Sequence, residues 1–153
     1  MKRLMLITVA CLLCNLWSNA QAIDFEKYAD MDDVTSVYIS PAMMGLVGNI
    51  DLDVEDVEIG KMAGKLEELK ILNSETPKGI RLLKEEARKI NAKNGYEELM
   101  RVNDEGDKTT IYMKQGKEGK NEFVLVNEEE DGELSIIIFL GNLTLKDVKK
   151  MMD

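Results

Sequence analysis

The chain has 153 residues, with 20 basic and 29 acidic side chains, so its net charge is −9. This length predicts a single domain. The negative charge argues against nucleic acid as a partner, because such binding depends on neutralising phosphates with Lys and Arg. The chain also has no histidine, which excludes Ser–His and Cys–His catalytic pairs.

The first 22 residues have the features of a secretory signal peptide. Lys2 and Arg3 form a basic start, an apolar run covers residues 4–13, and Ala20-Gln21-Ala22 matches the small-x-small pattern of a signal peptidase site. We therefore expect cleavage after Ala22 and a mature domain over residues 23–153. The mature protein would be exported to the periplasm and would have no stable membrane span.

Both cysteines, Cys11 and Cys14, lie inside this leader. One alternative is a lipoprotein anchored at Cys11, which follows a small residue but lacks the usual aliphatic residue three positions earlier. Another is an uncleaved anchor, although the segment is short for a membrane span. Cleavage after Ala22 leaves no cysteine, so neither a disulfide nor a thiolate metal site is available, and the absence of histidine excludes an imidazole site as well. It also leaves 18 basic against 29 acidic residues, a net charge of −11.

The beginning of the mature chain predicts two short helices around one strand. Residues 24–30 are expected to form a short helix. The β-branched and aromatic run over residues 34–39, VTSVYI, predicts a strand. Ser40 followed by Pro41 is typical of a helix start, because proline at the first helical position has no N–H to leave unpaired. Gly48 is expected to end that helix.

The stretch NIDLDVEDVEIGK, residues 49–61, holds five carboxylates but does not fit an EF-hand. With Asp51 in the first position, Asp56 replaces the required glycine and Met62 replaces the bidentate Glu. We favour a helix start, with Asp53 as its N-cap. A looser calcium site is the alternative, and its weak candidate ligands are Asp51, Asp53 and Glu55.

The next segment, residues 60–74, is ambiguous between helix and strand. Its apolar residues fit a helix before Gly64 and a strand after it, so we predict a helix to about Ala63 and a strand over residues 66–73. The alternative is that residues 64–74 extend the helix.

Thr76 and Pro77 begin the clearest helix, which Gly95 is expected to end. Beyond it the apolar period changes to two, which predicts strands over residues 96–102, 109–114, 122–126 and 133–140. Asp131-Gly132 is a two-residue hairpin signal. The last strand is apolar on both faces and should be an interior one. Thr144, with Asp147 three positions later, predicts a capping box for a final helix.

These elements predict an α+β fold, in which an antiparallel β-sheet with a C-terminal meander packs with helices after the signal peptide. Eight of the ten methionines lie beyond the leader. Methionine fills irregular core gaps and also lines adaptable binding surfaces. We favour core filling.

An ordered series of segments resembles the bacterial family called domain of unknown function 4252. The segments are FEKY at 25–28, VTSVYIS at 34–40, LKIL at 69–72, GYEELM at 95–100 and IIIFLGNLTL at 136–145. The resemblance spans nearly the whole mature chain and supports a strand at residues 69–72. It implies a small exported envelope protein of a Gram-negative bacterium, with no catalytic or ligand residues to transfer.

We therefore expect a non-catalytic periplasmic protein that binds another envelope protein or an envelope component, through the sheet or the methionine-bearing helices. No catalytic residue, cofactor or metal is expected. One alternative is a carrier of an apolar small molecule held between sheet and helices. A less favoured alternative is a carboxylate-based hydrolase, which needs two converging carboxylates.

Overall fold

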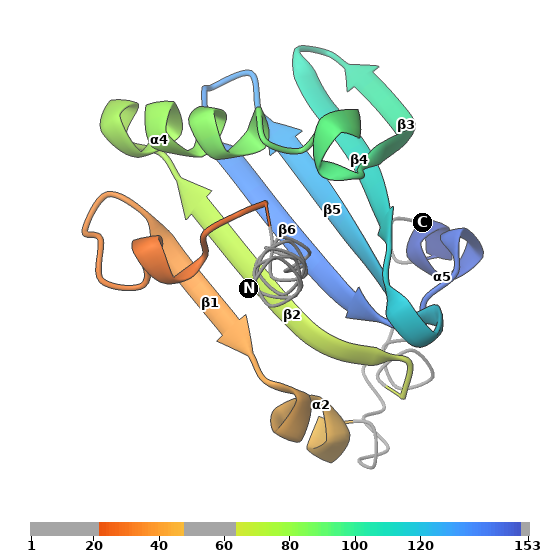
Figure 1. The fold of residues 1–153 in the computed structure, drawn as a ribbon. Helices are drawn as coiled ribbons and strands as arrows, with labels where there is room; N and C mark the ends of the chain where they lie inside the picture. Colours follow the sequence, from red (N-terminus) through yellow and green to blue (C-terminus); the bar gives the residue numbers. More distant parts are fainter. Residues whose placement is uncertain (1–21, 48–63, 151–153) are drawn as a thin grey trace, which may run out of the picture.

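The computed structural model describes residues 22–47 and 64–150 of the chain (Figure 1). The leader and the acidic stretch with Asp51, Asp53 and Glu55 lie outside these ranges, so the predictions made there stay predictions. The elements, in chain order, are η2 (Glu26–Tyr28), β1 (Thr35–Ile39), α2 (Pro41–Val47), β2 (Leu66–Ser74), α4 (Pro77–Ala87), η3 (Ala92–Asn94), β3 (Glu97–Asp104), β4 (Asp107–Gln115), η4 (Lys117–Gly119), β5 (Asn121–Glu128), β6 (Leu134–Gly141) and α5 (Leu145–Lys150).

The six strands form one sheet in the order β1-β2-β6-β5-β4-β3, and every pair is antiparallel. Strands β3 to β6 are the predicted meander, and β6 is an interior strand, as its apolar pattern predicts. After β2, the chain passes along α4 to the far edge of the sheet, where β3 begins (Figure 1). The α+β fold class is confirmed.

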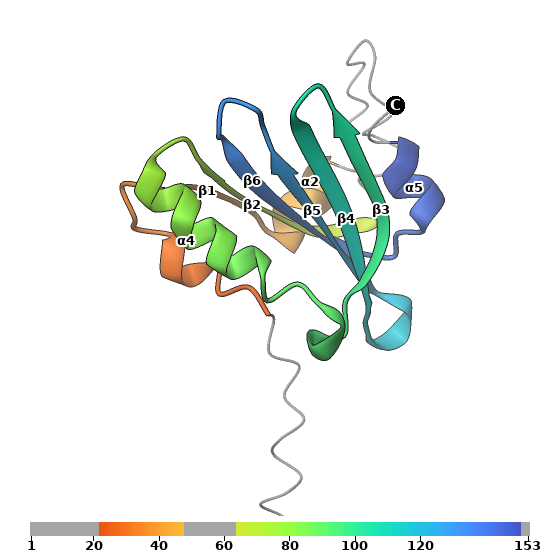
Figure 2. The same cartoon turned by 90° about the horizontal axis from the view of Figure 1, so that it is seen from above.

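Side chains alternate between the two faces of a strand, so each face of the sheet has its own core. The face that we call the α4 face packs against α4 and the segment around η2, with Leu72, Val124, Ile136, Leu83 and Tyr28 in its buried cluster. The opposite face, called the α2 face, carries a smaller cluster with Met44, Leu66, Ile111, Phe123 and Leu143. Figure 2 shows α4 on one side of the sheet and α2 and α5 on the other.

The centre of the α2 face is less completely covered than the α4 face. Val37, Ile71, Ile137 and Leu125 are partners in register across β1, β2, β6 and β5. Val37 is exposed and the other three are half-buried. A row of apolar side chains therefore runs from the middle of the sheet to its β1 edge.

The helix starts predicted at Pro41 and Pro77 are confirmed, but the end predicted for the long helix is wrong. Thr76 Oγ1 accepts from the Gly79 amide at 3.1 Å, yet α4 ends at Ala87 rather than near Gly95. The Asn91 side chain accepts from the amides of Lys93 and Asn94 and so starts the separate turn η3. Gly95 ends that turn in the left-handed conformation, with φ 84°.

Three other predictions have clear outcomes. Residues 66–74 form strand β2, not a helix extension. Thr144 and Asp147 form the predicted capping box, with Asp147 Oδ2 accepting from the Thr144 amide at 2.8 Å. β5 and β6 are joined at Asp131-Gly132, but the connection is longer than two residues, because the last backbone bond before the turn runs from the Glu129 amide to Glu133 O. Within residues 22–47 and 64–150, no helix is long and apolar enough to cross a membrane.

Candidate protein-binding edge

Strand β1 and helix α2 come from a stretch without charge. Residues 34–47, VTSVYISPAMMGLV, include no Asp, Glu, Lys or Arg, although these four types make up 32% of the chain. An uncharged stretch of this kind normally lies in the core. In this fold it lies at an edge of the sheet (Figure 1).

The exposed apolar side chains concentrate in the same stretch. Of the six large hydrophobic residues that are exposed in the described part of the chain, four are Val37, Tyr38, Met43 and Leu46, which are 40%, 50%, 52% and 63% exposed. The other two, Val102 and Leu145, lie on different elements. We call the sheet edge that carries these four side chains the β1–α2 edge. Val37 and Tyr38 are consecutive on β1 and therefore lie on its two opposite faces.

Helix α2 is held so that its outer side faces solvent. Ser40 begins the helix, because its Oγ accepts from the Met43 amide at 3.3 Å. Met44 is buried in the core of the α2 face. Met43 and Leu46 are three positions apart and therefore neighbours on the helix surface, where both remain exposed.

Tyr38 contacts Phe25 and Lys70 on the α4 face of the sheet. Its ring centroid is 6.2 Å from that of Phe25, and the Lys70 ammonium lies 5.7 Å from the centroid of each ring. Lys70 is itself paired with Glu68 at 2.7 Å. Phe25 and Lys70 thus cover one side of the Tyr38 ring, while Tyr38 remains 50% exposed.

The two edge strands of the sheet differ in charge and regularity. β1 pairs with β2 in unbroken register from Thr35↔Asn73 to Ile39↔Leu69. β3 carries four charged side chains and a register shift between Glu98 and Met100. Charges and bulges protect an edge strand from pairing with other chains. By this criterion β3 is protected from pairing with another chain, whereas β1 has neither a charged side chain nor a bulge to protect it.

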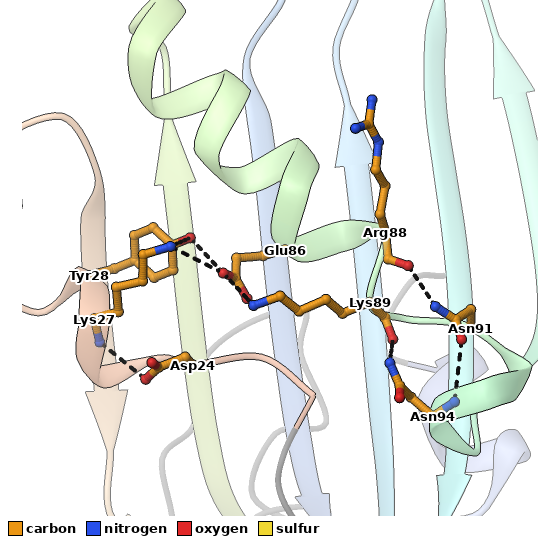
Figure 3. Close-up of polar contacts among 8 residues, drawn as sticks. All are labelled: Asp24, Lys27, Tyr28, Glu86, Arg88, Lys89, Asn91 and Asn94. Atoms are coloured by element: carbon orange, nitrogen blue, oxygen red, sulfur yellow. Dashed lines mark hydrogen bonds and ion pairs between the residues drawn. The ribbon is translucent and has the colours of Figure 1, made fainter.

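The most buried carboxylate among the described residues belongs to a network that joins helix α4 to the segment around η2 (Figure 3). Glu86 is 1% exposed, and its Oε1 accepts from the Tyr28 hydroxyl at 2.9 Å and from Lys89 Nζ at 2.8 Å. Lys27 lies 3.5 Å from the same oxygen. Burial and the bond to Glu86 raise the pKa of Tyr28 well above its usual value. Both oxygens of Glu86 have donors, because Oε2 accepts from Lys89 at 2.7 Å.

A second group of carboxylates was not singled out from the sequence. Ligand oxygens of Glu129, Asp131 and Glu133 lie within 4.8 Å of one another in the β5–β6 turn. The neighbouring Glu133 charge raises the pKa of Glu129 above its usual value. Glu133 already accepts from the Asn73 amide at 2.8 Å, and Asp131 from the Glu133 backbone at 3.1 Å. Asp131 is exposed and the other two are half-buried, and the bond from the Glu133 amide to Asp131 stabilises the backbone of this acidic turn.

A surface groove of about 420 Å³ lies beside η4. Six of its eight lining residues are charged or polar, and none is aromatic; the eight are Lys114, Gln115, Gly116, Lys117, Glu118, Lys120, Glu122 and Leu140. Pockets for apolar small molecules are lined mainly by hydrophobic and aromatic side chains. This groove therefore gives no support to the alternative of an apolar carrier.

In a comparison with known proteins, the model of the family described as domain of unknown function (DUF4252) matches residues 28–151. The chain belongs to the DUF4252 family. The resemblance seen in the sequence is thereby confirmed. No curated protein and no solved structure matches this DUF4252 chain significantly.

Sequence reasoning about this DUF4252 protein identified β1 and α2 but not their exposure. The available signal was the absence of charge over residues 34–47. The two neighbouring methionines differ in exposure, because Met44 is buried in the core while Met43 is exposed on the edge. Met62, Met151 and Met152 lie outside the described residues.

Proposed function

We propose that this DUF4252 protein is a non-catalytic, exported protein of the periplasm that binds another protein through the β1–α2 edge. The observation that carries the proposal is the concentration of exposed Val37, Tyr38, Met43 and Leu46 on one uncharged edge. Export is supported by the basic start, apolar run and small-x-small site of residues 1–22.

Single exposed apolar side chains are common on monomeric proteins and require no explanation. Here four of them lie within ten consecutive residues, Val37 to Leu46, on adjoining elements. Protein interfaces have apolar, charge-depleted centres enriched in aromatic residues and Met. The β1–α2 edge has this composition in a chain that is otherwise rich in charge.

The proposal is tested by photo-cross-linking in living cells. Met43 is replaced by a photoreactive phenylalanine analogue, and the matched control carries the analogue at Leu145, since the two side chains are 52% and 50% exposed. We expect a discrete protein adduct from position 43 and roughly tenfold less from position 145, because only a docked side chain stays close to one partner. Equal or absent adducts at the two positions would overturn the proposal.

Export is measured on the same cells. After osmotic release of the periplasm, the intact mass should correspond to a chain that begins at Ile23. A chain that stays in the cytoplasm with residues 1–22 attached would contradict the proposed location. Recovery in the membrane fraction with a lipid on Cys11 would replace the periplasmic location by the lipoprotein alternative.

A further inference from the structure

We propose that strand β1 pairs antiparallel with β1 of a second copy of this chain, so that two sheets join into one continuous sheet. This inference rests on the proposed function in that it uses the same edge, and it names the partner. Three observations support it. No described strand pairs with the outer side of β1, the pairing would bring uncharged residues opposite each other, and the two edge strands of the sheet differ in charge and regularity.

The free side of β1 is available for main-chain pairing. Within the described ranges, β1 is hydrogen-bonded to β2 alone and is the outermost strand. An edge strand directs alternate N–H and C=O groups away from its sheet, and a second strand can use them. All five residues of β1 keep a regular register with β2, so no bulge turns these groups away.

Antiparallel pairing centred on Val37 is self-complementary. Val37 then lies opposite Val37 of the second copy, and Thr35 lies opposite Ile39, which gives β-branched pairs on the α2 face. On the α4 face, Tyr38 lies opposite the small Ser36, which leaves room for the ring. Such cross-strand pairs stabilise sheets, whereas like charges placed opposite each other destabilise them. None of the five pairs contains a charge.

The charge distribution permits a second copy to approach at this edge. The chain has a net charge of −9, so two copies repel each other over most of their surfaces. The acidic residues closest to β1 in sequence, Asp32 and Asp33, precede its first residue. Antiparallel pairing places them at opposite ends of the joined strands. Asp33 is in addition paired with Lys78.

The opposite edge explains why the assembly would stop at two copies. Pairing of β1 with β3 of the next copy would be head-to-tail and would continue into an open fibre. The charged residues of β3, namely Glu97, Glu98, Arg101 and Asp104, and its register shift oppose that pairing. Pairing of β1 with β1 uses the same surface on both copies and therefore closes.

The joined strands are short, so we expect a weak, concentration-dependent dimer. Five residues of β1 supply less contact than a standard interface of about 800 Å² on each partner. The first test therefore traps the dimer covalently. Cys11 and Cys14 are replaced by Ser, and Val37→Cys is compared with Val102→Cys, because these two edge valines are 40% and 44% exposed.

Mild oxidation should join two Val37→Cys chains by a disulfide. The Cα atoms of directly opposite residues lie about 4.5–5.5 Å apart, which is within the range that a disulfide spans. We expect the Val37→Cys dimer to form roughly tenfold faster or more than the Val102→Cys dimer, whose thiols meet only by collision. Equal rates for the two variants would overturn the inference.

A second test uses charge at the same position. Val37→Lys alone and Val37→Glu alone should each be monomeric in native mass spectrometry, because each places like charges opposite each other. An equimolar mixture should restore a dimer that contains one copy of each variant. Loss of folding would not be restored by mixing, so this result separates pairing from stability. A mixture that stays monomeric at concentrations where the natural chain is dimeric would contradict the pairing at Val37.

The two proposals fail in different ways. The dimer would be overturned if the natural chain remained monomeric at a protein concentration on the order of 1 mM, because this exceeds the Kd of even a weak interface. A photo-adduct between position 43 and a different protein would then leave the proposed function standing. An adduct between two copies of this chain, together with the Val37→Cys disulfide, supports both proposals.

Discussion

The hydroxyl of Tyr28 donates a hydrogen bond of 2.9 Å to Oε1 of Glu86, and both side chains are buried. This bond joins the segment before β1 to helix α4, which are far apart in the sequence. Lys89 and Lys27 approach the same carboxylate from the surface (Figure 3). The segment held in this way also contains Phe25, whose ring lies beside Tyr38. The network therefore supports the inner side of the β1–α2 edge.

Tyr28→Phe removes one donor from a buried carboxylate that keeps its other bonds. We expect the free energy of unfolding to fall by about 1.5–3 kcal/mol, the range for hydrogen bonds to charged groups, as measured by urea denaturation. Tyr112→Phe is the control, because Tyr112 is half-buried on β4 and should change stability by less than about 0.5 kcal/mol. Equal effects of the two substitutions would mean that the bond to Glu86 contributes nothing.

Glu86 should make the protein sensitive to acid. Burial acts to raise its pKa, but the hydrogen bonds from Lys89 and Tyr28 and the Lys89 charge outweigh burial and hold the pKa below the usual 4.5. Because the folded pKa is lower than the unfolded one, this stabilisation is present above about pH 4.5 and is lost as the pH falls further. Glu86→Gln should therefore show a shallower loss of stability below pH 4.5 in urea titrations. Identical slopes for the two proteins would contradict the assignment.

Tyr96 should produce the opposite dependence at high pH. Burial, followed by its hydrogen bond to Glu122, raises the pKa of Tyr96 well above its usual 10. The folded state thus favours the neutral phenol, so stability is present below pH 10 and declines as the pH rises above it. Tyr96→Phe should reduce this alkaline decline. An alkaline titration followed by tyrosinate absorbance checks this directly. In the Tyr96→Phe variant, one fewer tyrosine than in the natural protein should stay neutral until the protein unfolds.

Two helical glycines should respond in opposite directions to replacement by alanine. A Cβ at Gly79 would lie 2.2 Å from the backbone oxygen of Asp33 and 2.1 Å from Ser74 Oγ. Gly79→Ala should therefore destabilise the fold by more than about 1 kcal/mol, despite the better helix propensity of alanine. A Cβ at Gly45 would meet nothing within 4 Å, so Gly45→Ala should stabilise by about 0.5–1 kcal/mol. The two midpoints in urea measure both effects.

Much of the fold follows from local signals in the sequence. Pro41 and Pro77 are each the first residue of a helix, and Thr144 with Asp147 forms a capping box, because these signals depend only on neighbouring backbone groups. The prediction that α4 ends near Gly95 is wrong, because the side chain of Asn91 starts a separate turn before Gly95. A capping side chain of this kind is not visible in apolar periodicity.

The candidate edge depends on long-range pairing, which periodicity does not specify. The run VTSVYI predicts a strand wherever it lies in the sheet. Its position at the edge follows from the pairing of β2 with β6, far along the chain. The Tyr28–Glu86 bond likewise joins residues separated by 58 positions. Only the absence of charge over residues 34–47 was available beforehand as a signal for the edge.

The most direct test of the central claim combines the photoreactive analogue at position 43 with a charge placed on the same edge. Leu46→Lys adds a positive charge to the β1–α2 edge at a side chain that is 63% exposed, and Leu145→Lys adds the same charge at a side chain that is 50% exposed elsewhere. We predict that Leu46→Lys lowers the adduct yield roughly tenfold, because burying an unpaired charge in an interface is costly, while Leu145→Lys leaves the yield unchanged. Equal yields in the two variants, at equal protein levels and equal melting temperatures, would contradict binding through this edge.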